Sequence, residues 1–413
     1  MIPREQVSLV RCASTLSDQA VVTQTLAAIQ QLDDYGKGLR NARTIAVKIN
    51  AGVHRLTLTD GKQTELTEPA VVEGAIRAIR EVTHAPILIG DATTDGDTMG
   101  LYAKLGYPER LARYPQVRLV DFSRSELVPV RMRHPQPMFA TYCLPRELAE
   151  ADAFVSLAKM KAHTSLGYTL CIKNLFGWMP MAVYGAPRSY LHDRLIRLPR
   201  VLVDMAQWMR PCLNVVDGIV AANKSEWGGT PLRPGVIVAG TNCVATDSVG
   251  ARVMGLDPDQ DYPHHPHFYR RNALKLAAQQ GLGPHRTADI DILGPAPEGG
   301  CEPFRVERYP GDTRRDAQLA RGAVCVAVYR EQQEALAKTH RGQYLALVDG
   351  QVVHQAADMQ GILTWEKGRG GDWQSAPQWV VRCLPVAEEV EQMDWYAVEA
   401  EHARHLACAG AAC

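Results

Sequence analysis

The apolar residues of this chain fall into short runs that alternate with longer segments of helical pattern. The runs are rich in β-branched residues, and most are closed by Asp, Asn or Gly. They read QVSLVRC, TIAVKIN, APILIGD, VRLVDF, DAFVSLA, LNVVDG, GVIVAG and DIDILG. Strands that are apolar on both faces and separated by helices are typical of a mostly parallel sheet with helices on both faces. The sequence therefore predicts an α/β domain over residues 1–295.

The pattern changes beyond residue 295. The stretch GPAPEGGCEPF is dense in Gly and Pro, which is typical of a linker. A helical stretch, EQQEALAKTH, is followed by RGQYLALVDGQVVHQ, in which Asp349-Gly350 predicts a two-residue hairpin turn, and by the strand pattern WVVRCLP. We predict a small α+β domain over residues 296–386 and a helical tail over residues 387–413.

Charge and composition narrow the setting. The chain has 45 Lys+Arg and 45 Asp+Glu, so no net field attracts nucleic acid or an anionic membrane. No apolar stretch reaches the roughly 18 residues that would span a bilayer, and the start MIPREQVSLVRCASTL lacks the apolar segment of a signal peptide. Ten dispersed cysteines are typical of reduced thiols. We expect a cytoplasmic protein without nucleic-acid or membrane partners, and a homodimer remains open.

One stretch, KMKAHTSLGYTLCIKNLFG, concentrates positive charge between apolar flanks. If its start is an extended loop after the strand DAFVSLA, the side chains of Lys159, Lys161 and His163 share one face. A short helix from Thr169, capped by Gly177, would stack Thr169 on Lys173. Solvated lysines are the plain alternative. Partly buried cations instead favour an anionic ligand, and crowding makes a lysine a better base or nucleophile.

Polar residues follow the predicted strands, where open α/β sheets bind ligands. They are Asn50 after the second strand, and Asp91 and Thr93 after the third. Further on, Thr241 and Asp247 begin a helix whose backbone amides could bind a phosphate. The alternative is that these side chains only cap or complement helices. We expect Lys159, Asn174 and these polar residues to bind an anion, with His163, Lys173 and Lys161 as the catalytic residues.

A family resemblance rests on several stretches in order: VKIN, TEPAVVEGAIRAIRE, ILIGDATT, EADAFVSLAKMKAHTSLGYTLCIKNLFGWMP, LHD, VVDGIVA and VAGTNCVATDSVGARVMGLDP. Over roughly residues 5–290 the chain resembles the DUF362 family, whose function is uncharacterised. Many relatives append a ferredoxin-like segment that binds an iron–sulfur cluster. This chain has no C-x-x-C-x-x-C run, so no such cluster is expected.

The layout of the same stretch is more distantly similar to the amino-terminal domain of lactate racemase-like proteins, which bind a nickel-pincer nucleotide. That resemblance implies Lys173 as the lysine that carries the cofactor, His163 as a metal ligand or proton-transfer residue, and His192 as a nickel ligand. This chain departs from the pattern at Asn50-Ala51-Gly52 and at Gly90-Asp91-Ala92-Thr93. A shared scaffold is therefore favoured over a shared reaction.

A second metal pattern lies in the tail, where His402, His405, Cys408 and Cys413 have side-chain types that suit zinc. Their spacing drifts around a helix, and chain ends fray. For His192 the alternative is an ordinary surface residue.

We therefore expect an enzyme that acts on a small carboxylate or phosphate metabolite, of isomerase, epimerase or redox type. A divalent metal (Ni, Zn or Fe) or an anionic nucleotide-type cofactor could assist it. The alternative is a non-catalytic accessory protein that holds an anionic cofactor or a metal.

Overall fold

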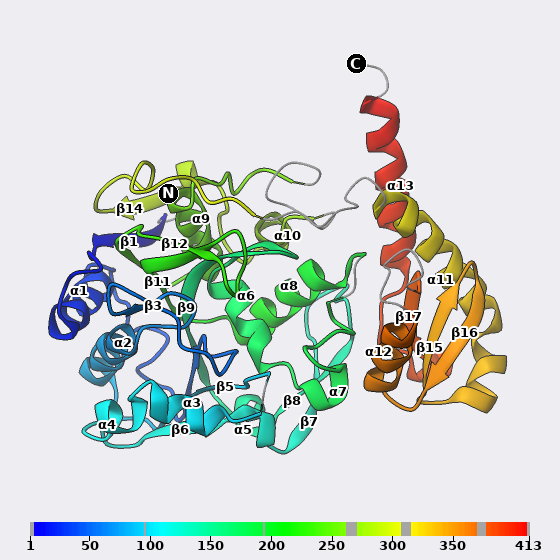
Figure 1. Ribbon diagram of the computed structural model, residues 1–413, viewed down its shortest axis with the longest axis horizontal. Coiled ribbons are helices and arrows are strands. Elements are labelled where there is room, and N and C mark those ends of the chain that lie inside the picture. The colour runs from blue at the N-terminus through cyan, green and yellow to red at the C-terminus, as the bar shows by residue number, and fades with distance from the viewer. Residues whose placement is uncertain are drawn as a thin grey trace. The chain divides into compact units, whose positions relative to one another are not determined.

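The computed structural model describes residues 4–94, 96–192, 195–261, 271–306, 315–369 and 377–410, without the side chains of 315, 316 and 405–410. The chain divides into two units (Figure 1). Taking the described residues of each range, the larger unit comprises Met1–Val128, Leu144–Met179 and Leu202–Arg308. The smaller unit comprises Pro129–Cys143, Pro180–Val201 and Tyr309–Cys413. The domain boundaries expected from the sequence stay predictions.

A ten-stranded sheet forms the centre of the larger unit. Its strands are β1 (Glu5–Arg11), β2 (Ile45–Ile49), β5 (Ile87–Asp91), β6 (Val117–Asp121), β9 (Ala153–His163), β10 (Gly167–Thr169), β11 (Leu213–Asn223), β12 (Thr230–Leu232), β13 (Val236–Gly240) and β14 (Ile290–Leu293). The main path runs β14-β1-β13-β11-β9-β2-β5-β6, with β10 paired to β9 and β12 to β11. Along that path of described strands, β13 alone is antiparallel to its neighbours. The predicted mostly parallel α/β sheet is confirmed.

Helices cover both faces of this sheet. They are α1 (Asp18–Gln30), α2 (Pro69–Val82), α3 (Thr98–Lys104), α4 (Tyr107–Leu111), α5 (Arg146–Ala149), α6 (Cys171–Leu175), α9 (Cys243–Val253) and α10 (Ala273–Gln279), together with part of α8 (Arg197–Met209). One buried cluster joins Val22 of α1 and Ile76 of α2 to Val47 of β2 and Val155 of β9. On the other face, α6 and α9 pack against β9, β11 and β13. The carboxyl ends of the parallel strands thus lie between two helical layers.

Sequence signals fix the starts of α1 and α2. Ser17 caps α1 by accepting a hydrogen bond from the Ala20 backbone amide at 3.3 Å, as expected for a Ser at this position. Pro69 begins α2, where its missing amide hydrogen has no cost. Both helices pack on the sheet through the buried cluster.

The smaller unit contains a three-stranded antiparallel sheet of β15 (Tyr344–Val348), β16 (Gln351–Ala356) and β17 (Trp379–Arg382), in the order β16-β15-β17. Its helices are α7 (Met181–Tyr184), α11 (Arg315–His340), α12 (Met359–Gly368), α13 (Asp394–Gly410) and the start of α8. The predicted hairpin is confirmed, because Val348 pairs with Gln351 across Asp349 and Gly350, which have φ of 48° and 78°. The predicted helix EQQEALAKTH is the last part of the longer α11.

Two small sheets complete the described strands. They are β3 (Leu58–Thr59) with β4 (Lys62–Gln63), and β7 (Leu127–Arg131) with β8 (Thr141–Pro145).

The positively charged stretch differs from its expected form in two respects. Strand β9 continues through Lys159 and Lys161 to His163, so these residues lie in a strand and not in a loop after it. The alternation is confirmed, because every second side chain of a strand points to the same face. Thr169 belongs to β10, where it pairs with Lys161. It therefore does not stack on Lys173 in a helix, because α6 begins only at Cys171.

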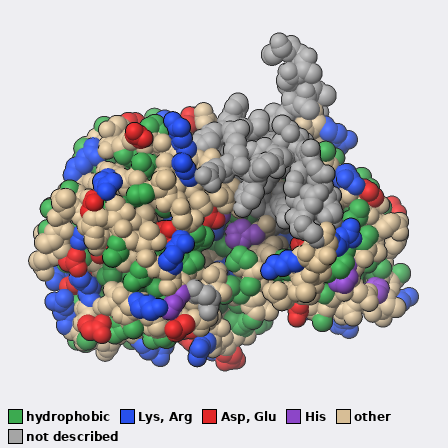
Figure 2. All heavy atoms as spheres, in the orientation of Figure 1, with side chains coloured by type: hydrophobic (Ala, Val, Ile, Leu, Met, Phe, Trp, Pro, Cys, Tyr) green, Lys and Arg blue, Asp and Glu red, His purple; other side chains and the backbone are tan. Residues whose placement is uncertain are grey.

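None of the described helices is both long and apolar enough to cross a bilayer. The face seen in Figure 2 mixes Lys and Arg with Asp and Glu side chains, in agreement with the balanced composition.

Candidate functional site

The site lies where four parallel strands end at the same edge of the sheet. Strands β11, β9, β2 and β5 are parallel to one another, so their carboxyl ends meet there. Asn50, Asp91 and Lys161 are brought together at this edge, as expected. Thr241 is not, because it follows the antiparallel strand β13, whose last residue Gly240 pairs with Asn214 near the start of β11.

Lys159 has its counter-ion on the neighbouring strand. Its Nζ lies 2.9 Å from Asp217 Oδ2, and both side chains have 0% exposure. Asp217 also accepts hydrogen bonds from the backbone amides of Glu68 at 2.8 Å and Ile219 at 3.2 Å. Such additional bonds offset the loss of hydration of a buried ion pair. Lys159 was expected to bind an external anion, but the charge of Asp217 neutralises it.

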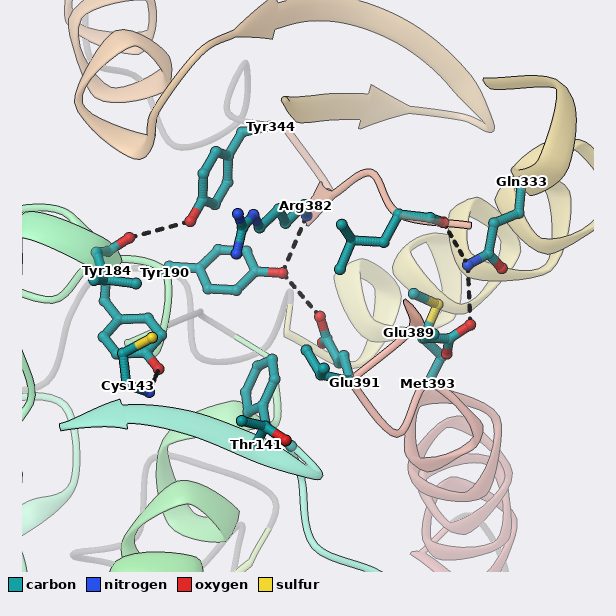
Figure 3. A pocket seen from close by; sticks show the side chains of 14 residues that line it. Thr141, Cys143, Tyr184, Tyr190, Gln333, Tyr344, Arg382, Glu389, Glu391 and Met393 are labelled. Atoms are coloured by element: carbon teal, nitrogen blue, oxygen red, sulfur yellow. Dashed lines mark hydrogen bonds between the residues drawn. The ribbon is translucent and has the colours of Figure 1, made fainter. Parts of the chain in front are cut away.

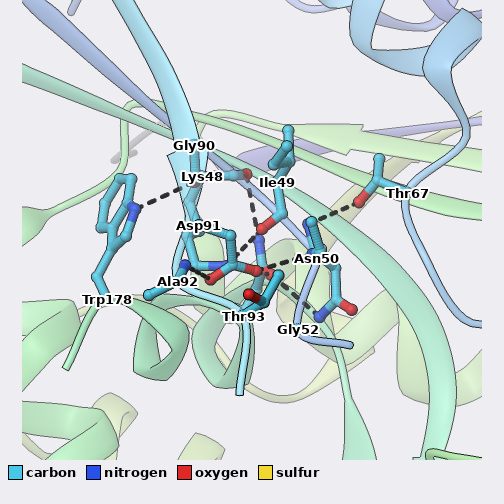
Figure 4. A network of polar contacts seen from close by, with 12 residues as sticks. Lys48, Ile49, Asn50, Gly52, Thr67, Gly90, Asp91, Ala92, Thr93 and Trp178 are labelled. Carbon is cyan, nitrogen blue, oxygen red and sulfur yellow. Dashed lines mark hydrogen bonds and ion pairs between the residues drawn. The ribbon is translucent and has the colours of Figure 1, made fainter. Parts of the chain in front are cut away.

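A second buried ion pair joins β2 to β5. Lys48 Nζ lies 2.8 Å from Asp91 Oδ2, and it also donates a hydrogen bond to the carbonyl of Ile49. Asp91 accepts the backbone amides of Ala51 and Ala92, each at 2.8 Å (Figure 4). The Asp91 carboxylate is thus occupied within the protein, and α3 is capped by Asp97 instead.

Asn50 connects the two faces of the sheet at the strand end. Lys48 of β2 is paired with Ser156 of β9, so these two side chains point to the same face of the sheet. Lys161 is an odd number of residues from Ser156 along β9, so its side chain points to the opposite face. Asn50 Oδ1 accepts a hydrogen bond from Lys161 Nζ at 3.0 Å. Its Nδ2 donates to Asn174 Oδ1 at 3.3 Å. The two hydrogen bonds orient the Asn50 amide, because the Lys161 amine donates through its N–H groups in either protonation state and Asn50 Nδ2 faces the Asn174 oxygen.

Asn174 holds the other side of this bridge. Its Nδ2 donates to the Lys48 carbonyl and to Ser156 Oγ, each at 3.2 Å. Its side chain, which projects from α6, is buried. Asn174 thus positions the ends of β2 and β9 relative to each other, and an anion-binding role for it stays a prediction.

Lys161 is buried, and no acidic side chain of the described residues is in direct contact with its amine. Its Nζ donates to Asn50 Oδ1 at 3.0 Å and to the Glu65 carbonyl at 2.9 Å, and it lies 3.5 Å from the centre of the Trp227 ring. Among the residues that the structure describes, it forms no ion pair. Burial lowers the pKa of Lys161 to about 7, with a further contribution from the charge of Lys173, against the opposing charges of Glu226 and Glu65. The amine is therefore partly neutral at physiological pH.

His163 is held in one tautomer by its own turn. The backbone amides of Ser165 and Leu166 donate to its Nδ1 at 3.1 and 3.3 Å. The ring proton of the neutral form therefore sits on Nε2, which lies 3.8 Å from Glu226 Oε1. Burial and the charges of Lys173 and Lys161 hold the pKa of His163 well below its ordinary value. His163 is thus a neutral hydrogen-bond donor through Nε2.

The helix α6 presents Lys173 near these groups. Lys173 is partly exposed, and its ammonium lies 4.5 Å from the centre of the Phe176 ring. The start of α6 is fixed by Asp247, whose two carboxylate oxygens accept the amides of Cys171 at 2.7 Å and Ile172 at 2.8 Å. Burial raises the pKa of Asp247 to about 7, although these two bonds act in the opposite direction. Asp247 therefore acts as an anchor for α6 in this structure.

The amino-terminus of α9 is already capped. Asn242 Oδ1 accepts the amides of Val244 at 3.0 Å and Ala245 at 3.1 Å. The phosphate site expected around Thr241 would have to displace this cap. Thr93 lies near the site edge, where its hydroxyl contacts Thr98 Oγ1 at 3.1 Å.

The described residues do not assemble the donor set of a nickel cofactor. His163 Nδ1 is occupied by backbone amides, and His192, in the smaller unit, donates from Nδ1 to the Pro187 carbonyl at 3.2 Å. Within the described parts of the chain, no three His, Cys, Asp or Glu side chains gather in a way that could hold a metal ion. In the tail pattern, His402 is described, but the side chains of His405 and Cys408 and the whole of Cys413 lie outside the described residues.

Sequence reasoning missed Lys48, Glu65 and Trp227. Lys48 had a usable signal, because a lysine inside the apolar run TIAVKIN must be paired if the strand is buried. Glu65 and Trp227 come from loops, and no local pattern identifies which of their atoms contact Lys161. Glu65 itself is held by Arg55 at 2.8 Å and by the Gly228 amide at 2.7 Å.

The site falls within the region that resembles known proteins. A family described as a domain of unknown function, DUF362, matches residues 45–252, from β2 into α9. The chain is also similar to a thylakoid-associated protein of Synechocystis sp., with 27% identity over 228 residues. This alignment covers 54% of the chain and 64% of that relative, which is less than two thirds of the relative's length. The similarity to lactate racemase-like proteins stays a prediction.

Proposed function

We propose, starting from the fact that this chain belongs to the DUF362 family, that the site at the strand ends is the active site of an enzyme. It would move a proton on a small anionic metabolite, in an isomerase or epimerase type of reaction. The observation that carries the proposal is the buried Lys161, whose pKa burial lowers to about 7 and which contacts neutral acceptors and a ring.

The contacts of Lys161 suit a general base. A neutral amine has two N–H groups and one lone pair. The two N–H groups match the two acceptors, Asn50 Oδ1 and the Glu65 carbonyl, so the lone pair is left to accept a proton. The Trp227 ring at 3.5 Å stabilises the ammonium that forms. A base whose pKa lies near the working pH is efficient in both directions of a proton transfer.

His163 and Lys173 would bind the substrate around that base. Lys161 and His163 are two residues apart in β9, so their Cα atoms are about 7 Å apart and their side chains share a face. The Nε2 proton of neutral His163 can donate to a substrate oxygen that gains negative charge as Lys161 removes a proton from the adjacent carbon. The positive charge of Lys173, which influences the pKa of both residues, favours a carboxylate or phosphate group.

Two other lysines would have a supporting role. Lys48 and Lys159 are each neutralised by a buried aspartate, so they contribute little net charge to a ligand. They fix the strand ends from which Asn50 and Lys161 project. The proposed substrate therefore has one anionic group for Lys173 and a C–H bond made acidic by a neighbouring carbonyl or carboxylate.

Deuterium exchange tests the proposal without knowledge of the product. The protein is incubated in D₂O with small 2-oxo acids, 2-hydroxy acids and sugar phosphates, and loss of the C–H signal is followed by NMR. We expect exchange into at least one compound, with a rate that rises with pH through about 7 as Lys161 loses its proton. Lys161→Met should abolish exchange, and Lys173→Ala should raise KM by about tenfold, as expected for loss of a charged hydrogen bond.

A matched control and a second readout separate the alternatives. Lys37→Met removes an exposed lysine of the same unit and should leave exchange unchanged. Acetylation of the partly exposed Lys173, followed by mass spectrometry, reports whether the same anions protect its amine. Protection of the amine without deuterium exchange would favour the alternative, in which this chain is a non-catalytic accessory protein that holds an anionic ligand. Neither protection nor exchange, or exchange that survives in Lys161→Met, would refute the active site.

We also propose that the protein works in the cytoplasm, because the described cysteines are all free thiols.

A further inference from the structure

The smaller unit contains a cavity of about 130 Å³ whose lining residues all belong to that unit. The size is close to that of a single aromatic ring, because an engineered apolar cavity of roughly 150 Å³ binds benzene. Thr141 and Cys143 of β8, Tyr184 of α7 and Arg382 of β17 contribute to the wall (Figure 3). The cavity is thus formed by segments far apart in the sequence.

Aromatic rings make up much of this wall, and their hydroxyl groups are already bonded within the protein. Tyr190 and Tyr344 meet edge to face, with ring centres 5.2 Å apart. The Tyr184 hydroxyl accepts the Cys143 amide at 2.9 Å, and the Tyr344 hydroxyl donates to the Val183 carbonyl at 3.1 Å. These bonds fix the rings, so the tyrosines present edges and faces to the cavity and suit a planar apolar group.

Arg382 provides the one positive charge among the residues that line the cavity. Figure 3 shows its guanidinium beside the rings of Tyr190 and Tyr344. Its backbone amide donates to the Tyr190 hydroxyl at 3.2 Å. Among the residues that the structure describes, the guanidinium itself forms no hydrogen bond and no ion pair.

The acidic groups of the wall, in contrast, already have partners. Glu391 is bound by Arg197 at 2.8 Å and accepts the Tyr190 hydroxyl at 2.9 Å. Glu389 accepts the side-chain amide of Gln333 at 3.0 Å. Among the charged groups of the wall, the one left to bind a ligand is therefore the planar guanidinium, which matches a carboxylate through two parallel hydrogen bonds.

We infer that this cavity is a binding site for a small aromatic carboxylate, with the ring among the tyrosines and the carboxylate on Arg382. A ring without charge would leave the exposed guanidinium to water and would gain no ion pair with it. A dianion would meet Glu389 and Glu391 in the same wall. A single carboxylate on a single ring pairs with Arg382, brings no second negative charge near Glu389 and Glu391, and fits the volume of the cavity.

Isothermal titration of the full chain with benzoate tests this inference, and benzamide is the neutral control of the same shape. We expect saturable binding of benzoate and at least about tenfold weaker binding of benzamide, the loss typical of a hydrogen bond to a charged group. Arg382→Met should weaken benzoate by a similar factor and leave benzamide unchanged. Arg369→Met removes another exposed arginine of this unit, stacked on Trp365 and not lining the cavity, and should change neither.

A second variant tests the position of the ring. Cys143→Phe fills the cavity from β8 and should abolish binding of both compounds, while circular dichroism checks that the fold is kept. In the wild type, benzoate should also slow alkylation of the partly exposed Cys143. The inference is refuted by equal affinity for benzoate and benzamide, by unchanged benzoate affinity in Arg382→Met, or by no saturable binding up to about 10 mM.

Discussion

Replacing Lys161 by Met should change the pH dependence of stability in a defined direction. Because burial lowers the pKa of Lys161 from 10.5 to about 7, the folded protein binds fewer protons than the unfolded chain between these two values. Stability of the wild type therefore rises with pH across this window. Below pH 7 the lysine is protonated in both states, and the full cost of burying the charge is present. Methionine does not titrate, so the variant lacks this slope.

The magnitude follows from the two pKa values. At 1.36 kcal/mol for each pKa unit, the interval from 10.5 to about 7 corresponds to a full cost of about 5 kcal/mol. Between pH 7 and pH 9.5, about 3 kcal/mol of it should disappear. The free energy of unfolding of Lys161→Met minus that of the wild type should thus fall by about 3 kcal/mol across this range. The loss of the hydrogen bonds to Asn50 and Glu65 lowers this difference by the same amount at every pH. The change of the difference with pH therefore reports only the titration of Lys161.

Urea unfolding at a series of pH values, followed by intrinsic fluorescence and fitted to two transitions, measures this difference. Lys37→Met is the control, because this exposed lysine should give a difference that does not vary with pH. A difference for Lys161→Met that stays constant from pH 7 to pH 9.5 would show that the buried amine is not neutral near pH 7. The reasoning that makes Lys161 a base would then be wrong.

Two further predictions concern the ion pairs around the site. Lys159→Met should lower the free energy of unfolding by about 3–5 kcal/mol, because it leaves Asp217 charged and buried. Urea titration should show a smaller loss in the double variant Lys159→Met/Asp217→Leu. If the effects of the two single substitutions simply added up in the double variant, the pairing would be contradicted. Gly177→Ala should reduce deuterium exchange while the chain stays folded, because the new Cβ would lie 2.6 Å from Asp91 Oδ1 and 2.7 Å from Lys48 Nζ. Unchanged exchange kinetics would show that the Lys48–Asp91 pair does not support the active site.

The fold could be predicted well because its signals are local. Runs such as APILIGD and GVIVAG are apolar on both faces, and each became a strand of the central sheet. Asp349-Gly350 supplies the two positive φ angles of a tight hairpin. Local signals did not reveal the direction in which each strand runs in the sheet. Nothing in GVIVAG shows that β13 runs against its neighbours, so Thr241 was expected at the edge opposite to the one where it lies.

The site could be predicted only in part, for a related reason. The alternation of Lys159, Lys161 and His163 follows from strand geometry alone, and it is confirmed. Their different environments depend on partners from distant segments. Asp217 neutralises Lys159 across a gap of 58 residues, whereas Lys161 meets the Glu65 carbonyl at a separation of 96 residues. Two lysines with the same sequence context thus have different chemistry.

The separation of Lys159 from Asp217 also has a consequence for synthesis of the chain. Strand β9 leaves the ribosome before β11 has been made, so its lysine has no counter-ion while the preceding strands β2 and β5, with their own Lys48–Asp91 pair, are already complete. A chain that is made from its amino-terminus tends to fold in that order. If β9 packed on β2 before β11 was made, the Lys159 ammonium would be buried in an apolar layer without its counter-ion. This cost favours a nascent chain in which β9 joins the sheet only together with β11.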